Sequence, residues 1–521
     1  MRRLFLLCTL LLAVSPHLFT QTIVEHSYDA GYAEQAGAIC RTQDGGVALA
    51  SVFRDTVSLL NRNYALTKLD AQGQHVFTHL FGFGPPIGCE PYKIVQTPDK
   101  GFCIAGLYRY YAILLKTDSA GNVQWCRASG DLTYNGILTD VICTSDGAIA
   151  VCGTQAYASS TVPDPTDLFV AKYSLQGNSI WRFVYSSMAP NISRPTLTEN
   201  SNGELRIASE LPHNGGRFLL TRLDGNGGVL SCTSYYFGPA VSLCTVTNAP
   251  ANGNYISATV YDTAASTYST MLMRTDAAGQ PAWSYLFGIS GRTLESKRHI
   301  THSNGEVWML ALCTGQGVNR MTSIHVNANA GNPIALDHGP SSGFAGGIAE
   351  AGNGEIVLSS HHYPNAAWND LHVSRVEPGT TVDCGGMFKP VLRDTVSLLV
   401  STVGIQVSAP LLTDTLIAPV QTSVSCSQGN HCSIVSVKEP AHEQMSLSAY
   451  PNPADENVTF QLENHTEKMR IHLFDALGRE IWSAHFAGKI SLQTKAYPAG
   501  IYFYRLEQEG EVKATGKLMI R

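Results

Sequence analysis

The segments AILLKTD (Ala112–Asp118) and FLLTRLD (Phe218–Asp224) are two copies of a pattern that recurs through most of the chain. In each copy an apolar run ends at a basic residue, and an aspartate follows two positions later. The basic position, or a histidine in its place, recurs at intervals of 48, 56, 50, 52, 51 and 50 residues. A period of about fifty residues indicates a repeat architecture. The seven positions are Lys68, Lys116, Lys172, Arg222, Arg274, His325 and Arg375.

Two turn signals flank the basic position of each unit. Before it lies an Asp-Gly or Asn-Gly pair, as at Asp146–Gly147, with Asp99–Gly101 (Asp-Lys-Gly) in the second unit. Such pairs between apolar runs favour tight hairpins, because both residues tolerate positive φ. After it lies Asp-x-x-Gly in four units, with Ser174 and Gly177 in the third. Asp at the first and Gly at the fourth position are typical of a type I turn.

Short strands rich in Val, Ile, Leu and Tyr lie between these turns, four in each unit. Four antiparallel strands repeated seven times are typical of a β-propeller, and continuous apolar runs such as Ile113–Leu115 suit sheets covered on both faces. We therefore predict an all-β fold with a seven-bladed β-propeller of four-stranded blades at residues 21–390. An open β-solenoid is the alternative. The segment Ile23–Gly31 resembles the last strand of a blade, so we expect it to complete the seventh sheet and close the ring.

The N-terminal segment has the pattern of an export signal. Arg2 and Arg3 precede an apolar run, Leu4–Val14, which predicts a Sec signal peptide at residues 1–20. Cys8 lies inside this run rather than at its end, which disfavours the alternative of a lipoprotein. No later stretch is long and apolar enough to span a bilayer.

Composition narrows the function classes. The net charge of −6 is not clustered, and no basic stripe suggests a nucleic-acid partner. Thirteen cysteines less Cys8 leave twelve, an even number in a chain that we expect to reach an oxidising compartment. We therefore expect disulfides, with Cys426–Cys432 and Cys232–Cys244 as the pairs close enough in sequence to propose.

The C-terminal part differs from the repeats in composition and in its motifs. Residues 391–440 are rich in Val, Ser, Thr, Leu and Pro and predict a β-rich spacer of two or three short strands and a linker. Residues 441–521 predict a small Ig-like antiparallel β-sandwich. Three motifs follow one another there: YPNP, the turn Asp-x-x-Gly, and Pro-x-Gly-x-Tyr before a basic closing strand. Their residues are Tyr450, Pro451, Asn452, Pro453, Asp475, Gly478, Pro498, Gly500, Tyr502 and Lys517.

These motifs, in this order over residues 445–521, closely resemble the type A C-terminal sorting domain of the type IX secretion system of Bacteroidota. The resemblance implies Sec export to the periplasm, recognition by the outer-membrane translocon, and then release or attachment to the cell surface. An ordinary Ig-like adhesion domain is the alternative. The repeats of residues 35–385 also resemble β-propeller repeats of secreted Bacteroidota proteins, a resemblance that implies no activity.

The sequence contains no complete catalytic motif. Asp118, Gly121 and Trp125 have one residue too many for a sialidase Asp-box, and no Walker loop, Gly-x-Ser-x-Gly or His-Glu-x-x-His is present. The histidines that suggest a metal site are His361 with His362 and His299 with His302. Because a lone histidine pair on a loop is more often exposed to solvent, we expect these side chains to be exposed rather than metal-bound. We predict no catalytic residue, no metal site and no cofactor.

The repeated side chains have structural explanations. We expect each repeated cation to pair with the Asp two residues later, on the same side of its strand. We expect Trp125, Trp181 and Trp283, at equivalent positions, to pack between blades.

Two function classes remain. The first is a monomeric binding or adhesion scaffold for a surface glycan or protein, with the insert Ala156–Asp167, which includes Tyr157, Pro163 and Pro165, as a recognition loop. The alternative is a secreted hydrolase of glycans or peptides, which requires carboxylates at the centre of the propeller.

Overall fold

The structure is a computed structural model that describes residues 23–520 apart from short stretches of the chain. These stretches are 30–32, 55–61, 84–88, 131–133, 158–165, 188–191, 212–215, 238–239, 263–266, 316–317, 328–332, 339–343, 366–367, 378–391, 396–398, 403–404, 409–413, 417–419, 425–426, 435–446, 463–467, 476–479 and 509–510. The expected signal peptide lies outside the described residues. Two compact units are present, Met1–Ser436 and Val437–Arg521.

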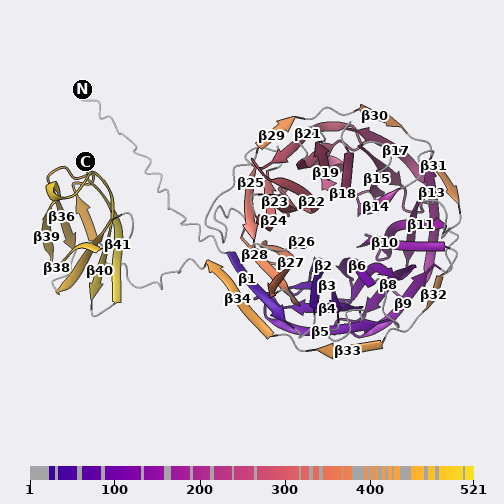
Figure 1. The fold of residues 1–521 in the computed structure, drawn as a ribbon, viewed down its shortest axis with the longest axis horizontal. Coiled ribbons are helices and arrows are strands. Elements are labelled where there is room, and N and C mark those ends of the chain that lie inside the picture. The colour runs from indigo at the N-terminus through magenta and orange to yellow at the C-terminus, as the bar shows by residue number, and fades with distance from the viewer. Residues whose placement is uncertain are drawn as a thin grey trace, which may run out of the picture. The chain divides into compact units, whose positions relative to one another are not determined.

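The first unit is a seven-bladed propeller, which confirms the predicted fold and excludes the open solenoid (Figure 1). Blades one to three consist of β2 (Ala33–Arg41), β3 (Val47–Arg54), β4 (Arg62–Leu69) and β5 (His75–Gly82); β6 (Cys89–Gln96), β7 (Phe102–Tyr108), β8 (Tyr111–Thr117) and β9 (Val123–Ser129); β10 (Tyr134–Cys143), β11 (Ile149–Tyr157), β12 (Asp167–Tyr173) and β13 (Ser179–Ser187). Blades four and five consist of β14 (Ser193–Glu199), β15 (Leu205–Leu211), β16 (Arg217–Leu223) and β17 (Val229–Tyr236); β18 (Ala240–Ala249), β19 (Gly253–Asp262), β20 (Thr267–Thr275) and β21 (Pro281–Gly288), with the 3-10 turn η1 (Pro250–Asn252). Blades six and seven consist of β22 (Thr293–Thr301), β23 (Val307–Gly315), β24 (Val318–Val326) and β25 (Ile334–His338); β26 (Phe344–Glu350), β27 (Ile356–Asn365), β28 (Trp368–Val376) and β1 (Ile23–Asp29).

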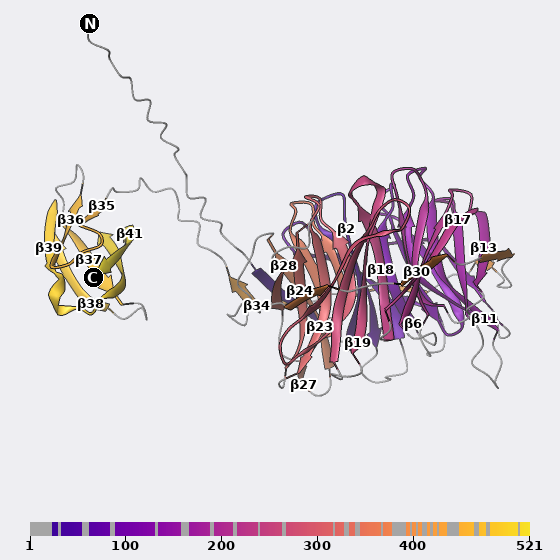
Figure 2. The ribbon, with the colours of Figure 1, turned by 90° about the horizontal axis from the view of Figure 1, so that it is seen from above.

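The first strand of each blade lies at the centre of the ring, and the strands run roughly along the ring axis (Figure 2). The turns after the first and third strands therefore meet at one end of the propeller, which we call the hairpin face. In the first blade, Gly45 N–H donates to Thr42 O and Gly73 N–H donates to Asp70 O, and both glycines have positive φ. The second and fourth strands of each blade terminate at the opposite end of the propeller, which we call the connector face.

The ring is closed by the N-terminal strand, as predicted. β1 pairs antiparallel with β28, so that Ile23 lies opposite Val376. Tyr28 of β1 is 1% exposed and donates from its hydroxyl to Gly73 O in the first blade, at 2.6 Å. Tyr185 and Tyr235 make the same bond from the third and fourth blades to the next blade. The closing strand thus repeats the contact that joins neighbouring blades elsewhere.

The segment expected as a spacer forms a belt around the propeller. Six strands, rather than two or three, each add a fifth strand to the outer edge of one blade, in the order five, four, three, two, one, seven (Figure 1). The chain therefore runs round the ring against the direction of the blades, and pairs edges that would otherwise offer free N–H and C=O groups. The belt strands are β29 (Leu392–Thr395), β30 (Leu399–Thr402), β31 (Ile405–Ser408), β32 (Asp414–Leu416), β33 (Val420–Val424) and β34 (Ser427–Ile434).

The second unit is a small antiparallel sandwich, as predicted. A three-stranded and a four-stranded sheet enclose one core, which includes Phe460, Ile471, Tyr504 and Leu518. Its elements are β35 (Leu447–Tyr450), β36 (Asn457–Leu462), β37 (Met469–Phe474), β38 (Glu480–Phe486), β39 (Lys489–Gln493), η2 (Thr494–Ala496), β40 (Gly500–Gln508) and β41 (Glu511–Ile520).

Candidate functional site

A cavity of about 410 Å³ lies at the centre of the propeller. Inner strands of all seven blades contribute to its wall, together with Val52, Leu312 and His361 from second strands. The inner-strand residues lie at the middle of β10 and β22 and at or before the middle of the other inner strands. Volumes of roughly 300–1,000 Å³ are usual for small-ligand sites.

A β-bulge in every inner strand shapes the cavity. The register between first and second strands shifts once per blade, in each case at the level of the cavity. A bulge re-aims a side chain that regular alternation would turn elsewhere. Each blade contributes at least one bulge residue to the cavity wall, and the first of these in each blade are, in chain order, Ala36, Tyr92, Thr139, Arg194, Leu243, Lys297 and Gly346.

An arginine crosses the ring one residue beyond these bulges. Arg298 of the sixth blade donates from Nη2 to Tyr92 O at 2.8 Å and to Thr139 O at 3.3 Å, on the second and third blades. Its Nη1 lies 3.7 Å from Asp140 Oδ2, and Lys93 Nζ lies 3.8 Å from Asp140 Oδ1. Because these blades face one another across the ring, the Arg298 side chain spans the centre of the ring and forms part of the cavity wall.

The carboxylates near the cavity are engaged. Asp140 is buried, and its two oxygens accept hydrogen bonds from the backbone N–H groups of Val141 and Leu197. Glu90 accepts a hydrogen bond from the Tyr92 hydroxyl at 2.9 Å. Burial and the charge of Glu90 raise the pKa of Tyr92, and the charge of Arg194 opposes this rise. The cavity therefore combines a partly exposed carboxylate with cations and a phenol.

Six of the seven repeated positions pair with acids in the described part of the chain, but not with those predicted. Lys68 pairs with Asp44 at 3.0 Å and Lys116 with Asp99 at 2.9 Å, both in the preceding hairpin turn. The expected partner Asp70 instead accepts hydrogen bonds from the N–H groups of residues 72 and 74 within its own turn, at 2.9 and 2.8 Å. The prediction was wrong because the short carboxylate of this turn closes its own backbone.

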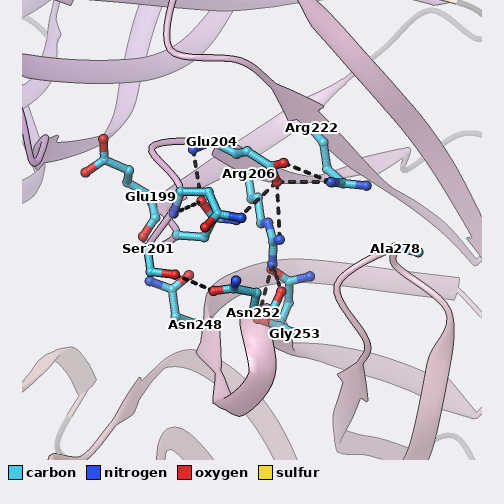
Figure 3. A network of polar contacts seen from close by, with 12 residues as sticks. Glu199, Ser201, Glu204, Arg206, Arg222, Asn248, Asn252, Gly253 and Ala278 are labelled. Atoms are coloured by element: carbon cyan, nitrogen blue, oxygen red, sulfur yellow. Dashed lines mark hydrogen bonds and ion pairs between the residues drawn. The ribbon is translucent and has the colours of Figure 1, made fainter.

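In three of the four units with Asn-Gly, the glutamate directly after the glycine takes the acid's place, whereas the fifth unit has Asn254 there. Glu204 accepts from Arg222 and also from Arg206, which is fully buried and donates to Asn254 of the fifth blade (Figure 3). Burial works against ionisation of Glu204, but both guanidinium groups hold its pKa below the ordinary value. This network joins the fourth blade to the fifth. The remaining pairs of this kind are His325 with Glu306 and Arg375 with Glu355.

The tryptophans pack between blades, as predicted. Trp125 donates from Nε1 to Leu175 O at 2.8 Å and Trp181 to Gly225 O at 3.2 Å, in each case in the next blade. Trp283 packs against the core shared by the fifth and sixth blades.

Of the histidines considered for metal binding, His299, His302 and His361 are buried rather than exposed, contrary to expectation, and take part in separate contacts. His299 is buried between the hydroxyls of Ser257 and Thr247, and burial lowers its pKa to about 3. His302 contacts Gly354 O. Nowhere in the described part of the chain do three or more His, Cys, Asp or Glu side chains form a group that could hold a metal ion. The side chain of His362 lies outside the described residues, as does most of the proposed recognition loop 156–167.

The expected Cys232–Cys244 disulfide is absent. Both thiols are free and buried; Cys232 lies on the outer strand of the fourth blade and Cys244 on the inner strand of the fifth. The strand spacing fixed by the sheets, rather than the short separation in sequence, decides this distance. All nine described cysteines are free, whereas Cys426 lies outside the described residues.

The structure brings together several of the predicted sorting residues. Asn452 donates from Nδ2 to Lys517 O at 2.7 Å and accepts from Met519 N–H at 2.9 Å, so YPNP contacts the last strand. Tyr502 is buried and donates to Pro498 O at 2.7 Å. Tyr450 and Gly500 lie at the ends of β35 and β40. Asp475 follows β37, and Gly478 lies outside the described residues. Their role in sorting stays a prediction.

The chain thus combines a propeller with a central cavity and a C-terminal sandwich that carries the three sorting motifs. Residues 448–521 match the family described as the secretion system C-terminal sorting domain, so the second unit is such a domain. The match confirms the resemblance to type IX sorting domains, and it indicates export to the outer surface or secretion. No helix in the described ranges is long and apolar enough to cross a membrane.

No curated protein matches the chain in sequence. Among solved structures, a protein of unknown function from Dyadobacter fermentans is 11% identical, with 69% of this chain and 98% of that chain covered and a TM-score of 0.42. The polysaccharide lyase Uly1 is 12% identical, with 66% and 90% covered and a TM-score of 0.41. A GH43_1 enzyme from Xanthomonas citri is 9% identical, with 50% and 89% covered and a TM-score of 0.29. Likenesses of this size carry no functional conclusion.

Proposed function

We propose that this protein is a binding module delivered to the cell exterior, whose propeller holds a ligand in its central cavity. Residues 1–20 direct Sec export, the C-terminal domain engages the type IX outer-membrane machinery, and the propeller then acts at the surface or free in the medium. The observation that carries the binding role is the ring of seven bulges, which directs side chains from six blades, and the backbone of Gly346 from the seventh, into one cavity.

The engaged state of the nearby carboxylates supports binding over hydrolysis. A glycosidase of the usual kind needs two carboxyl groups that flank the scissile bond, one as acid and one as base or nucleophile. Asp140 is buried behind Lys93 and Arg298 and accepts two backbone hydrogen bonds. Glu90, whose side chain is 45% exposed, is the carboxylate among the residues that line the cavity. Within the described residues, the cavity wall does not present such a pair.

Binding is tested on the mature full chain with arrays of glycans and surface proteins. Leu243→Trp places a bulky ring in the cavity, and Leu230→Trp makes the same change on an outer strand where Leu230 is 49% exposed. We expect the first variant to lose the captured ligand and the second to keep it. Equal binding by both variants would place recognition elsewhere on the propeller and refute the central site.

Export is tested separately in a host with a type IX system. A chain that ends at Ser436 should remain in the periplasm, and a reporter fused to residues 437–521 should reach the medium or the surface. Export of the truncated chain would contradict the role of the C-terminal domain.

A further inference from the structure

One cation of the cavity wall has no acidic partner among the residues that the structure describes. Arg194 lies at the bulge of β14, and its exposed side chain lines the cavity. Lys93, Lys297 and Arg298 each lie within 4 Å of a carboxylate. Arg194 makes no ion pair with a carboxylate that the structure describes. Its guanidinium is therefore the cation of this wall that is free to meet a ligand.

Arg194 has a backbone conformation that is rare for residues other than glycine, and hydrogen bonds with the neighbouring blades hold it in place. Its φ is 41°, in the left-handed region that residues other than glycine rarely adopt. Residues in such conformations cluster at ligand sites when the surrounding structure holds them there. In this bulge the Thr139 hydroxyl donates to Pro195 O at 2.5 Å, and the Thr196 hydroxyl donates to Cys244 O at 3.3 Å. Both neighbouring blades thus hold the bulge in place.

The groups around Arg194 define the ligand chemistry. A guanidinium offers a planar fork that matches a carboxylate with two hydrogen bonds. Glu90, on the same wall, has a partly exposed carboxylate that accepts a hydrogen bond from the Tyr92 hydroxyl and lies 3.9 Å from Arg62 Nη1. Its exposed part can accept from ligand hydroxyls, and its charge disfavours a second negative group close by. Gln35 adds an amide to the wall. This mixture favours a ligand with one negative charge and many hydroxyls over a polyanion.

We propose that the central cavity binds a uronic-acid sugar, with the sugar carboxylate on Arg194 and its hydroxyls on Glu90 and neighbouring polar groups. The cavity volume of about 410 Å³ lies near the lower end of the roughly 300–1,000 Å³ seen for small-ligand sites, which suits one or two sugar rings rather than a long chain. This inference rests on the proposed binding function and specifies its ligand.

The test is calorimetric titration of the mature full chain with a galacturonic acid disaccharide and with the matched neutral galactose disaccharide. We expect the acidic sugar to bind about 10- to 100-fold more tightly, with an affinity that falls as salt rises. Arg194→Gln should remove this preference without weakening the neutral sugar, and Arg194→Lys should retain part of it. Arg41→Gln, on an exposed arginine at the other end of an inner strand, should change neither affinity.

Three outcomes would overturn the inference in distinguishable ways. If glycans bind and Leu243→Trp abolishes their binding, but Arg194→Gln changes the affinity of neither sugar, the binding function stands and the uronate assignment fails. If a short peptide with a C-terminal carboxylate binds more tightly than the acidic sugar, the ligand class is wrong. If neither sugar nor any arrayed ligand requires the cavity, both proposals fail.

Discussion

Replacing Lys116 by methionine should destabilise the propeller far more than its place at the end of β8, next to a surface turn, suggests. The Lys116 side chain is fully buried, and Nζ donates to both oxygens of Asp99, to Thr117 O and to Gln124 Oε1. Breaking a buried ion pair usually costs about 3–5 kcal/mol of unfolding free energy. The Asp99 side chain is 38% exposed, so water can solvate it in the variant. We therefore expect Lys116→Met to cost about 2–3 kcal/mol.

A double-mutant cycle identifies the partner. Lys116→Met and Asp99→Asn should be non-additive by about 1–2 kcal/mol, because they remove the same ion pair. Lys116→Met and Asp118→Asn should be additive within about 0.5 kcal/mol, because Asp118 accepts hydrogen bonds within its own turn and asparagine can do the same. The assay is urea unfolding of the mature chain, followed by tryptophan fluorescence. A larger coupling with Asp118 than with Asp99 would refute the assignment.

Three further predictions concern ring closure, the acids and the thiols. Tyr28→Phe should lower the unfolding free energy by about 1 kcal/mol, measured by the urea midpoint, because the hydrogen bond to Gly73 O is lost. Deletion of residues 23–29 should lower the melting temperature of the whole propeller, and no change would contradict ring closure by β1. Asp44, Asp99, Asp146 and Glu204, which pair with the repeated cations, have lowered pKa values. Their contribution to stability is therefore present above about pH 4 and is lost as pH falls through the lowered pKa values. A urea midpoint that rises as pH falls from about 5 to 2 would contradict this. Native protein should react little with Ellman's reagent at the nine described thiols, since seven are buried and two are half-buried, and unfolding without reductant should release all nine; the release of fewer would indicate a disulfide among them.

The periodic and local features of the molecule are predictable from the sequence. The fifty-residue period gives the number of blades, the glycine-containing pairs locate the hairpins, and Ile23–Gly31 is recognisable as a missing fourth strand. The sorting domain is likewise identified by motifs close together in the chain. These signals depend on backbone preferences of a few adjacent residues, which act in the same way in every unit.

A subtler signal for the ion pairs and bulges was present in the sequence. The acid partner is the aspartate of Asp-Gly but the glutamate that follows Asn-Gly, as in Asn202–Glu204 and Asn353–Glu355. The bulge residues lie seven to nine positions before the turn Asp or Asn, as Tyr92 does before Asp99 and Arg194 before Asn202. Their identities differ from blade to blade, so no repeated motif marks them.

Only the tertiary structure decides the course of the belt, the free state of the nine described cysteines and the cavity on which the binding proposal rests. Arg298 reaches carbonyl oxygens 206 and 159 residues away, and the belt pairs its strands with edges that lie hundreds of residues earlier in the chain. Ring closure brings these groups together, because it places the first strand of every blade around one axis. Residue spacing along the chain reports the length of a blade, but it carries no measure of distance across the ring.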